Sequence, residues 1–422
     1  MCVTWCVTGH KMALLRSTDG RNAAPRDRRP LPGAGRNRVI LRVASIFFSG
    51  GTLKNFPRSF KRNAGVSAAM LGVSALLLSG CGAAPEEESD SSDAAGSANS
   101  DFTACIVSDE GGFDDRSFNQ SSYEGLKAAE KDLGVTVREA QSQSETDFLP
   151  NLDSMIGEGC NLTVTVGYLL ADATKSVAEA NPDRNFAIVD DNSIDLDNVK
   201  PIIYDTAEAA FLAGYVAAGT SETGKVATYG GINIPTVTIF MDGFADGVEY
   251  YNEQNDADVA LLGWNKADQT GSFVGNFTDT VAGKTTTQSF LNEGADIIMP
   301  VAGPVGDGTL DAIVEANANG GSNKVIWVDS DGFETNDKGT EYILTSVMKL
   351  MGEAVEEVIS TDVEGNFDAA PYIGTLENGG VALAPYHDQE DAVPADVKSA
   401  VDEIKAKIIS GEITVDSAAS PK

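Results

Sequence analysis

Carboxylate side chains follow several predicted strands of this chain, at the point where each strand ends. Because the carboxyl ends of parallel strands meet at one edge of a sheet, these groups are expected to converge on one site. Paired carboxylates accept hydrogen bonds from neighbouring hydroxyl groups, so they suit a neutral polyol such as a sugar or a nucleoside. An aspartate after a strand also serves as a helix N-cap, which is the structural alternative for each position taken singly. The carboxylates at strand ends are Asp109, Asp190, Asp191 and Asp329.

Glycines and aromatic residues lie in the same set of loops. Glycine lets the backbone approach a ligand closely, and an aromatic face stacks on a planar ring. Together with the carboxylates, these residues predict a cleft that binds a ring-bearing polyol. The loops contain Gly112 to Asn119, Gly167-Tyr168, Gly230-Gly231, Trp264-Asn265 and Ala302 to Gly306.

Motifs for other chemistries are incomplete. The glycines at 303, 306 and 308 lack the Lys-Ser/Thr of a phosphate-binding loop, and Asp329-x-Asp331-Gly lacks the distal glutamate of a calcium loop. Asp190-Asp191 has no nucleophile to pair with, and His387 is the single histidine from residue 81 onward. We therefore expect no catalytic residue, no metal site and no cofactor.

The first hundred residues have the pattern of an exported lipoprotein. Basic residues at 58, 61 and 62 precede an uncharged run over 64–80, which is typical of a signal peptide. The run closes on Leu78-Ser79-Gly80-Cys81, which resembles the bacterial lipobox and predicts lipidation of Cys81. We interpret 1–57 as a mis-annotated or disordered extension, 58–80 as the signal peptide and 81–100 as a flexible acidic Ser/Ala linker.

Charge is distributed unevenly along the chain. The formal net charge is −33, and residues 1–80 contribute 13 Lys/Arg against two aspartates, which leaves 17 basic and 61 acidic residues from 81 onward. A surface so acidic repels nucleic acid, so no nucleic-acid partner is expected.

The part of the chain after Cys81 keeps two cysteines, Cys105 and Cys160. The predicted strands place them on or beside neighbouring strands, and disulfides persist in exported proteins. A Cys105–Cys160 disulfide and two buried free thiols are both open at this point.

Strands and helices alternate along two consecutive stretches, 101–204 and 225–328, with a break near 205–224. Parallel strands need crossover connections, which are helical here, so two parallel sheets covered by helices are expected. Two short strands at 372–376 and 381–383 are predicted to form an antiparallel piece, and the last helix is predicted over 395–410.

One signature identifies a family. Residues 109–125 read Asp-x-Gly-Gly-Phe-Asp-Asp-Arg-Ser-Phe-Asn-Gln-x-x-Tyr-Glu-Gly. This resembles the opening of the basic membrane protein family of ABC-transporter substrate-binding lipoproteins, a group that includes bacterial purine nucleoside receptors. Further matches run in family order over about 101–388, among them Val301-Ala302-Gly303, Trp327-Val328-Asp329-Ser330-Asp331 and Thr345-Ser346-Val347-Met348-Lys349.

The resemblance implies a fold and a set of site residues. The fold is α/β, of the type I periplasmic-binding-protein kind, with two doubly wound parallel-sheet lobes joined by a hinge. Lobe 1 is expected over 101–207 with a return segment near 330–360, and lobe 2 over 208–329 with C-terminal segments within 361–422. The implied ligand-binding residues are Asp109, Asp115, Phe118, Asn119, Asp190, Gly303, Asp329 and Lys349, with either Phe240 or Phe277 as the second ring contact.

The resemblance also implies function and partners. It points to a monomeric, lipid-anchored protein on the outer face of the cell membrane that binds a nucleoside, with purines favoured, and delivers it to an ABC permease and its ATPase. The sequence departs from the family pattern at Tyr168-Leu169-Leu170, which leaves the wall that selects the base undefined. Two alternatives stay open: the same fold binding a sugar or a signalling molecule, and a secreted nucleoside hydrolase that uses Asp190 and Asp329 on a metal.

Overall fold

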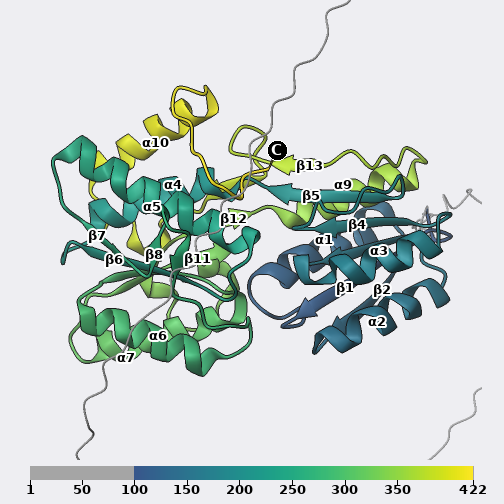
Figure 1. Cartoon of the computed structure of the whole chain (residues 1–422), viewed down its shortest axis with the longest axis horizontal. Helices are drawn as coiled ribbons and strands as arrows, with labels where there is room; N and C mark the ends of the chain where they lie inside the picture. The colour runs from purple at the N-terminus through teal and green to yellow at the C-terminus, as the bar shows by residue number, and fades with distance from the viewer. Residues whose placement is uncertain (1–98, 422) are drawn as a thin grey trace, which may run out of the picture. The chain divides into compact units, whose positions relative to one another are not determined.

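The computed structural model describes residues 99–421, and these form part of one compact unit. The predicted signal peptide, Cys81 and the linker up to residue 98 lie outside the described residues. Within residues 99–421, no helix has both the length and the apolar content needed to cross a membrane. In this described part of the chain, the strands form two six-stranded sheets and a separate two-stranded hairpin, and helices pack around the sheets (Figure 1).

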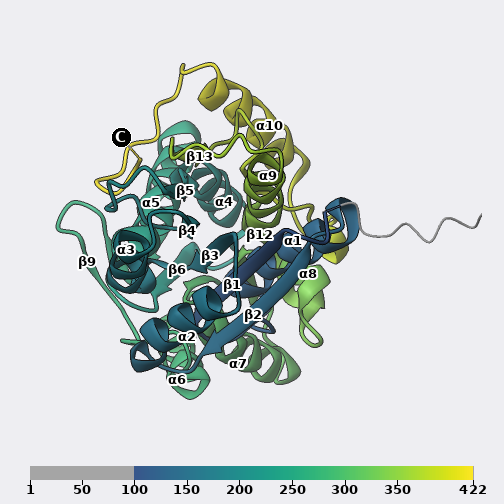
Figure 2. The same ribbon diagram turned by 90° about the vertical axis from the view of Figure 1, so that its right-hand side faces the viewer.

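The first sheet has the strand order β13-β5-β4-β3-β1-β2, and every neighbouring pair is parallel. Helices α1 and α2 lie on opposite sides of β1 and β2 (Figure 2). The elements up to the end of this run are β1 (Thr103–Glu110), α1 (Phe118–Leu133), β2 (Thr136–Ser142), α2 (Glu145–Gly157), β3 (Leu162–Val166), η1 (Tyr168–Leu170), α3 (Ala171–Ala180), β4 (Asn185–Val189) and β5 (Val199–Tyr204).

The second sheet has the order β14-β12-β11-β10-β6-β7 and is parallel except for β14, which pairs antiparallel with β12. Its elements begin with α4 (Thr206–Thr220), β6 (Lys225–Gly230), α5 (Pro235–Asn255), β7 (Ala260–Leu262), the hairpin β8 (Trp264–Asn265) and β9 (Thr270–Gly271), and α6 (Thr280–Glu293). They continue with β10 (Ile297–Val301), η2 (Gly303–Val305), α7 (Gly306–Ala318), β11 (Lys324–Asp329), α8 (Gly332–Thr335), η3 (Thr340–Tyr342) and β12 (Ile343–Lys349). The last elements of the chain are α9 (Met351–Val363), β13 (Tyr372–Gly374), β14 (Val381–Leu383), η4 (His387–Gln389) and α10 (Ala395–Ile409).

Alternate residues of the central strands pack on opposite faces of each sheet. In β10, Ile297 and Met299 belong to the core that contains α4 and α5, whereas Ile298 packs with Phe290 of α6. Strands buried on both faces are continuously apolar, which is why the strand segments read as unbroken hydrophobic runs. The predicted α/β fold with two parallel sheets covered by helices is confirmed.

Helices α4 and α5 pack with their backbones close together. Gly247 of α5 lies against the carbonyl oxygen of Phe211 in α4, and any side chain at position 247 would collide with it. Helix α4 is built largely from small residues and is buried along nearly its whole length. This close packing explains the small-residue composition of 206–220, which carries no amphipathic pattern.

Three segments connect the two sheets. They are the β5 to α4 junction at Asp205, the β12 to α9 junction at Leu350, and the stretch between β13 and β14. Backbone hydrogen bonds hold them together, from Asp205 N to the Gly374 carbonyl oxygen at 2.8 Å and from Leu350 N to the Gly380 carbonyl oxygen at 3.0 Å. The junctions therefore form one connected region between the lobes.

The C-terminal segments are placed differently from the sequence prediction. Strand β12 lies within 330–360, which was expected to return to the first lobe, yet it pairs with β11 in the second sheet; only α9, which packs on α1, makes that return. The prediction that the strands at 372–376 and 381–383 pair with each other is also wrong. Strand β13 pairs with β5 in the first sheet, and β14 pairs with β12 in the second. A short apolar strand fits the edge of either sheet, so only the tertiary register decides where it goes.

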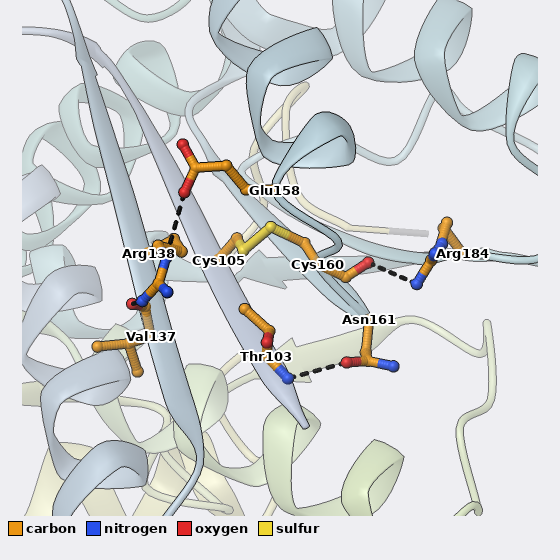
Figure 3. The surroundings of a disulfide bond; sticks show 8 residues. All are labelled: Thr103, Cys105, Val137, Arg138, Glu158, Cys160, Asn161 and Arg184. Carbon is orange, nitrogen blue, oxygen red and sulfur yellow. Dashed lines mark hydrogen bonds and ion pairs between the residues drawn. A yellow bond between two sulfur atoms is a disulfide. The ribbon is translucent and has the colours of Figure 1, made fainter. Parts of the chain in front are cut away.

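A disulfide joins Cys105 of β1 to Cys160, which lies two residues before β3, with their Cα atoms 5.9 Å apart (Figure 3). Both residues are buried, and they belong to the core that contains Phe148 and Leu152 of α2. Beside the disulfide, Arg138 of β2 pairs with Glu158 at the end of α2 at 3.2 Å, and Thr103 N of β1 donates to Asn161 Oδ1 at 2.8 Å (Figure 3). The pairing that the sequence left open is therefore made.

Reduction of this disulfide is expected to lower the free energy of unfolding by about 2 to 4 kcal/mol. The bond closes a sequence separation of 55 residues, so its loss gives the unfolded chain considerable conformational freedom. Urea unfolding with and without reductant measures the change. A Cys105→Ala/Cys160→Ala variant is the control, because the reductant should leave its stability unchanged. Equal stability of the oxidised and reduced wild type would contradict the expectation.

Candidate ligand-binding site

All ten residues proposed for ligand binding line one pocket. Its cavity volume is about 60 Å³, and it opens to solvent. Both sheets contribute to it through the carboxyl ends of their strands. The predicted residues that it brings together are Asp109, Asp115, Phe118, Asn119, Asp190, Phe240, Phe277, Gly303, Asp329 and Lys349.

Asp190 and Asp329 occupy matching positions in the two lobes. Asp190 follows β4 of the first sheet and Asp329 ends β11 of the second, and both have a left-handed backbone, with φ of 66° and 70°. Residues other than glycine seldom adopt this conformation, which costs about 1 to 3 kcal/mol and is concentrated at functional sites. Two aspartates with this costly backbone conformation in one pocket indicate that the pocket is a functional site.

Lys349, the last residue of β12, reaches between these two aspartates. Its Nζ lies 2.5 Å from Asp190 Oδ2 and 3.6 Å from Asp329 Oδ1, and all three residues are buried. Burial by itself would lower the pKa of Lys349, but the carboxylates of Asp190 and Asp329 outweigh it and raise the pKa. The ammonium group is therefore charged at neutral pH and links the two lobes across the pocket.

Aromatic rings surround this ion cluster. The Lys349 Nζ lies 4.9 Å from the ring centroid of Phe118 and 5.2 Å from that of Phe240. Phe240 is 1% exposed and forms part of the core, whereas Phe118 and Phe277 keep part of their surface open to the pocket. The open rings lie on opposite lobes, Phe118 at the start of α1 and Phe277 in the loop before α6.

Asp109 and Asn119 form a second polar group in the pocket. Asn119 Nδ2 donates to Asp109 Oδ1 at 2.8 Å and to Asp115 Oδ2 at 3.2 Å. Burial raises the pKa of Asp109 well above its usual range, and Asn119 only partly offsets this. Gly167 lies against the Asp109 carboxylate, where any side chain would collide with it. In the described part of the chain Asn119 Oδ1 is buried and has no hydrogen-bond partner.

Asp115 is engaged in holding the start of α1. Its carboxylate accepts hydrogen bonds from the backbone N–H groups of Ser117, Asn119 and Gln120 at 2.9 to 3.0 Å. These are donors that a helix N-terminus leaves unpaired, so Asp115 satisfies them as a capping residue does. The helix consequently begins at Phe118, and this places Phe118 and Asn119 at the pocket.

Asp115 is expected to make the folded protein less stable at pH 7 than at pH 5. Burial raises its pKa to about 6, although its backbone donors oppose the rise, whereas its unfolded pKa is about 3.9. Between these values the folded state binds more protons, so the free energy of unfolding falls as pH rises, by about 1 kcal/mol from this group between pH 5 and 7.

Urea unfolding of wild type and Asp115→Asn at both pH values measures this contribution. The variant is expected to lose stability at both, but its decrease between pH 5 and 7 should be smaller by about 1 kcal/mol. Asp114→Asn, at the exposed neighbouring position, is the control and should keep the wild-type pH dependence. An identical pH dependence in all three proteins would contradict the prediction.

The loop between β1 and α1 docks on the second lobe, a contact that sequence reasoning missed. Arg116 has a left-handed backbone, with φ of 59°, and its carbonyl oxygen accepts three hydrogen bonds from the end of β11 and α8. These come from Trp327 Nε1 at 3.1 Å, Ser330 Oγ at 2.7 Å and Thr335 Oγ1 at 2.9 Å. Its guanidinium group pairs with Asp307 at 3.1 Å and Asp337 at 2.5 Å.

Ser117 extends the same docking contact to the ion cluster, because its Oγ donates to Asp329 Oδ2 at 2.8 Å. Arg116 and Ser117 lie within the quoted signature, so their position between assigned residues was the available signal. Among residues 99–421, no group of three or more His, Cys, Asp or Glu side chains is arranged to hold a metal ion.

Two α/β lobes, three connecting segments and a pocket lined by both lobes define a solute-binding protein of the type I periplasmic-binding-protein fold. The family described as ABC transporter substrate-binding protein PnrA-like matches residues 102–419, and the chain belongs to this family. The resemblance found in the sequence is thereby confirmed.

Individual relatives agree with this assignment. The ABC transporter nucleoside-binding protein BmpA of Lactococcus lactis is 31% identical over 371 residues, covering 85% of this chain and 99% of the relative. An uncharacterized lipoprotein of Pyrococcus furiosus is 29% identical over 326 residues, covering 73% of this chain and 79% of the relative. The crystal structure of a solute-binding protein of an ABC transporter system from Aeropyrum pernix K1 superposes with a TM-score of 0.67 at 29% identity, covering 74% of this chain and 92% of that one.

Family membership defines the class of activity. The protein is an extracytoplasmic substrate-binding component of an ABC transporter and is not an enzyme. This excludes the alternative of a nucleoside hydrolase using Asp190 and Asp329. Family membership also implies a permease and an ATPase as transport partners.

Proposed function

We propose that the protein is a lipid-anchored receptor that captures a nucleoside, with purines preferred, for import. The observation that carries this proposal is the cluster in which the Lys349 ammonium group lies between Asp190 and Asp329. The relative from Lactococcus lactis is named as nucleoside-binding, which supports the same ligand class for this chain.

The carboxylates of Asp190 and Asp329 suit the hydroxyl groups of a ribose. The Lys349 ammonium group counteracts the rise in the pKa of Asp190 that burial causes, and a charged acceptor makes hydrogen bonds about twice as strong as a neutral one does. Asp190 belongs to one lobe and Asp329 to the other, so a ribose can contact both only when the lobes are together. We infer that the sugar drives hinge closure in this way.

The base fits between Phe118 and Phe277. Both rings keep open surface and lie on opposite lobes, whereas Phe240 is already covered by the core. Phe277 is therefore our choice for the second ring contact. Asn119 and Asp109, which also line the pocket, would add polar contacts to the base. The Asp115 carboxylate positions the start of α1 rather than contacting the ligand.

A thermal-shift panel tests the proposal against the sugar alternative. Inosine, guanosine and adenosine should raise the melting temperature, cytidine should raise it less, and ribose, glucose and galactose should leave it unchanged, because a sugar alone does not use the aromatic rings. Stabilisation by a monosaccharide without stabilisation by any nucleoside would favour the alternative ligand.

The membrane anchor is proposed to be a lipid on Cys81. The signal-peptide pattern and the lipobox support this, as does the lipoprotein name of the Pyrococcus relative. Replacing Cys81 with alanine should move the protein from the membrane fraction to the soluble fraction, because one or two acyl chains supply the membrane affinity. Ser79→Thr is a control that keeps the cysteine. Membrane retention of Cys81→Ala would contradict the assignment.

A further inference from the structure

The loop between β1 and α1 joins the two lobes outside the ligand pocket. It belongs to the first lobe, whereas the residues that Arg116 contacts lie at the end of β11, on α7 and around α8 in the second lobe (Figure 1). These partners are Trp327, Ser330, Thr335, Asp307 and Asp337. Neither Arg116 nor any of these five partners is among the residues that line the pocket. Arg116 and its five partners therefore form an interlobe contact that is separate from the pocket.

The backbone of Arg116 is held by the second lobe. Residues other than glycine seldom adopt a left-handed backbone such as that of Arg116, with φ of 59°, so tertiary contacts must stabilise it. The indole N–H of Trp327 donates to the Arg116 carbonyl oxygen at 3.1 Å, and Trp327 is buried in the core of the second lobe. The loop is therefore anchored to a well-packed part of the opposite lobe.

The guanidinium group of Arg116 adds two ion pairs that solvent can reach. Its nitrogens lie 3.1 Å from Asp307 in the first turn of α7 and 2.5 Å from Asp337. The side chains of Arg116, Asp307 and Asp337 are 31%, 25% and 82% exposed. Salt screens ion pairs of this kind, whereas it screens the buried Lys349 cluster much less. The strength of the interlobe contact should therefore fall as salt concentration rises.

Ser117 connects this contact to the pocket. It is fully buried and follows Arg116 directly, and its Oγ donates to Asp329 Oδ2 at 2.8 Å. Helix α1 begins at the next residue, Phe118, which lines the pocket. The loop that docks on the second lobe thus also holds one wall of the pocket in place. When the lobes separate, the interlobe contact and the pocket must open together.

We propose that Arg116 is a positioning residue that sets how long the closed protein retains its ligand, without contacting the ligand itself. This inference rests on the proposed capture of a nucleoside by hinge closure. Because the interlobe contact lies outside the pocket, it stabilises the closed form by the same amount whichever ligand is bound. Arg116 therefore acts on ligand retention and not on ligand selectivity.

Stopped-flow kinetics with Arg116→Asn tests this role. Asparagine tolerates the left-handed backbone but removes both ion pairs. The dissociation rates of inosine and cytidine should rise by the same factor, about fivefold, and the association rates should stay within twofold because the ligand enters the open form. Arg138→Asn is the matched control, because it breaks the pair with Glu158 inside the first lobe and should leave both rates unchanged.

Two further measurements assign the effect to the pairs between the lobes. Asp307→Asn/Asp337→Asn should raise the dissociation rate by a similar factor, and adding Arg116→Asn to it should change the rate no further. Raising the salt concentration from about 0.05 to 1 M should raise the dissociation rate of wild type but leave that of Arg116→Asn within twofold.

An interlobe distance tests the contact without any nucleoside. Spin labels at Lys175→Cys of α3 and Gln288→Cys of α6, exposed positions on opposite lobes, report this distance by pulsed electron paramagnetic resonance. Arg116→Asn should enlarge the population with the longer distance.

The outcomes separate this inference from the function on which it rests. Dissociation rates of Arg116→Asn equal to those of wild type would overturn the role of Arg116 and leave the nucleoside function standing. A rise for inosine but not for cytidine would also overturn it, because Arg116 would then act on the ligand. If no nucleoside binds, the nucleoside function falls, and a longer interlobe distance in Arg116→Asn would still support the contact whereas an unchanged distance would overturn it.

Discussion

Replacing Asp329 with alanine is expected to weaken nucleoside binding about 100-fold, which corresponds to about 3 kcal/mol. In the proposed complex this carboxylate accepts hydrogen bonds from the ribose inside a closed pocket, where no water can replace it. The residue is 7% exposed and lies 3.6 Å from the Lys349 ammonium group. Calorimetric titration with the best-bound purine nucleoside measures the loss.

Asp311→Ala is the matched control for this experiment. Asp311 lies in the same lobe, on α7, but it pairs with Lys338 at the surface, at 2.6 Å. Its loss should leave nucleoside affinity within twofold of wild type, and circular dichroism should show both variants folded. An Asp329→Ala variant that is folded and binds with wild-type affinity would remove Asp329 from the site.

Replacing Lys349 with methionine is expected to lower the free energy of unfolding by about 3 to 5 kcal/mol. Methionine fills much of the same volume but leaves Asp190 and Asp329 buried together without their cation. Breaking one side of a buried ion cluster in this way is far more destabilising than breaking a surface pair. Urea unfolding of the ligand-free protein measures the change.

Two further variants show whether charge is the cause. Lys338→Met breaks the surface pair with Asp311 and should cost no more than about 1 kcal/mol. Asp190→Asn/Lys349→Met should recover part of the stability that Lys349→Met loses, because it removes one buried charge. A loss equal to that of Lys338→Met, with no recovery in the double variant, would show that the cluster contributes only as a surface pair does.

The pH dependence of this cluster has a definite sign. The pKa of Lys349 is higher in the folded chain than its unfolded value of about 10.4. Its stabilising contribution is therefore complete below that unfolded value and is lost as pH rises through the folded-state pKa. Wild type should consequently lose this contribution only in strongly alkaline solution, and Lys349→Met should lack that alkaline loss.

The convergence of the candidate site residues on one pocket could be predicted from the sequence because a simple rule governs it. The carboxyl ends of parallel strands converge, so Asp109, Asp190 and Asp329 could be expected in one place from the order of strands and helices alone. The family signature added Phe118, Asn119 and Lys349. To predict that all of these residues line one pocket, it was enough to assign the alternation of strands and helices correctly.

Other features depend on tertiary contacts that a linear pattern does not encode. Strand β12 was predicted in the first lobe but pairs with β11 in the second sheet, and β13 was predicted in the second lobe but pairs with β5 in the first sheet. A short apolar segment carries no information on its pairing partner, so the sequence could not decide this. The docking of Arg116 on α8 joins residues more than two hundred positions apart in the chain.

The central claim is that the pocket between Asp190 and Asp329 holds a nucleoside. The most direct measurement is the mass-spectrometric identification of the small molecule released by heat from protein purified without added ligand. We predict a purine nucleoside in molar proportion to the wild type and its loss from Asp329→Ala. A monosaccharide released in molar proportion, with no nucleoside, would contradict the claim.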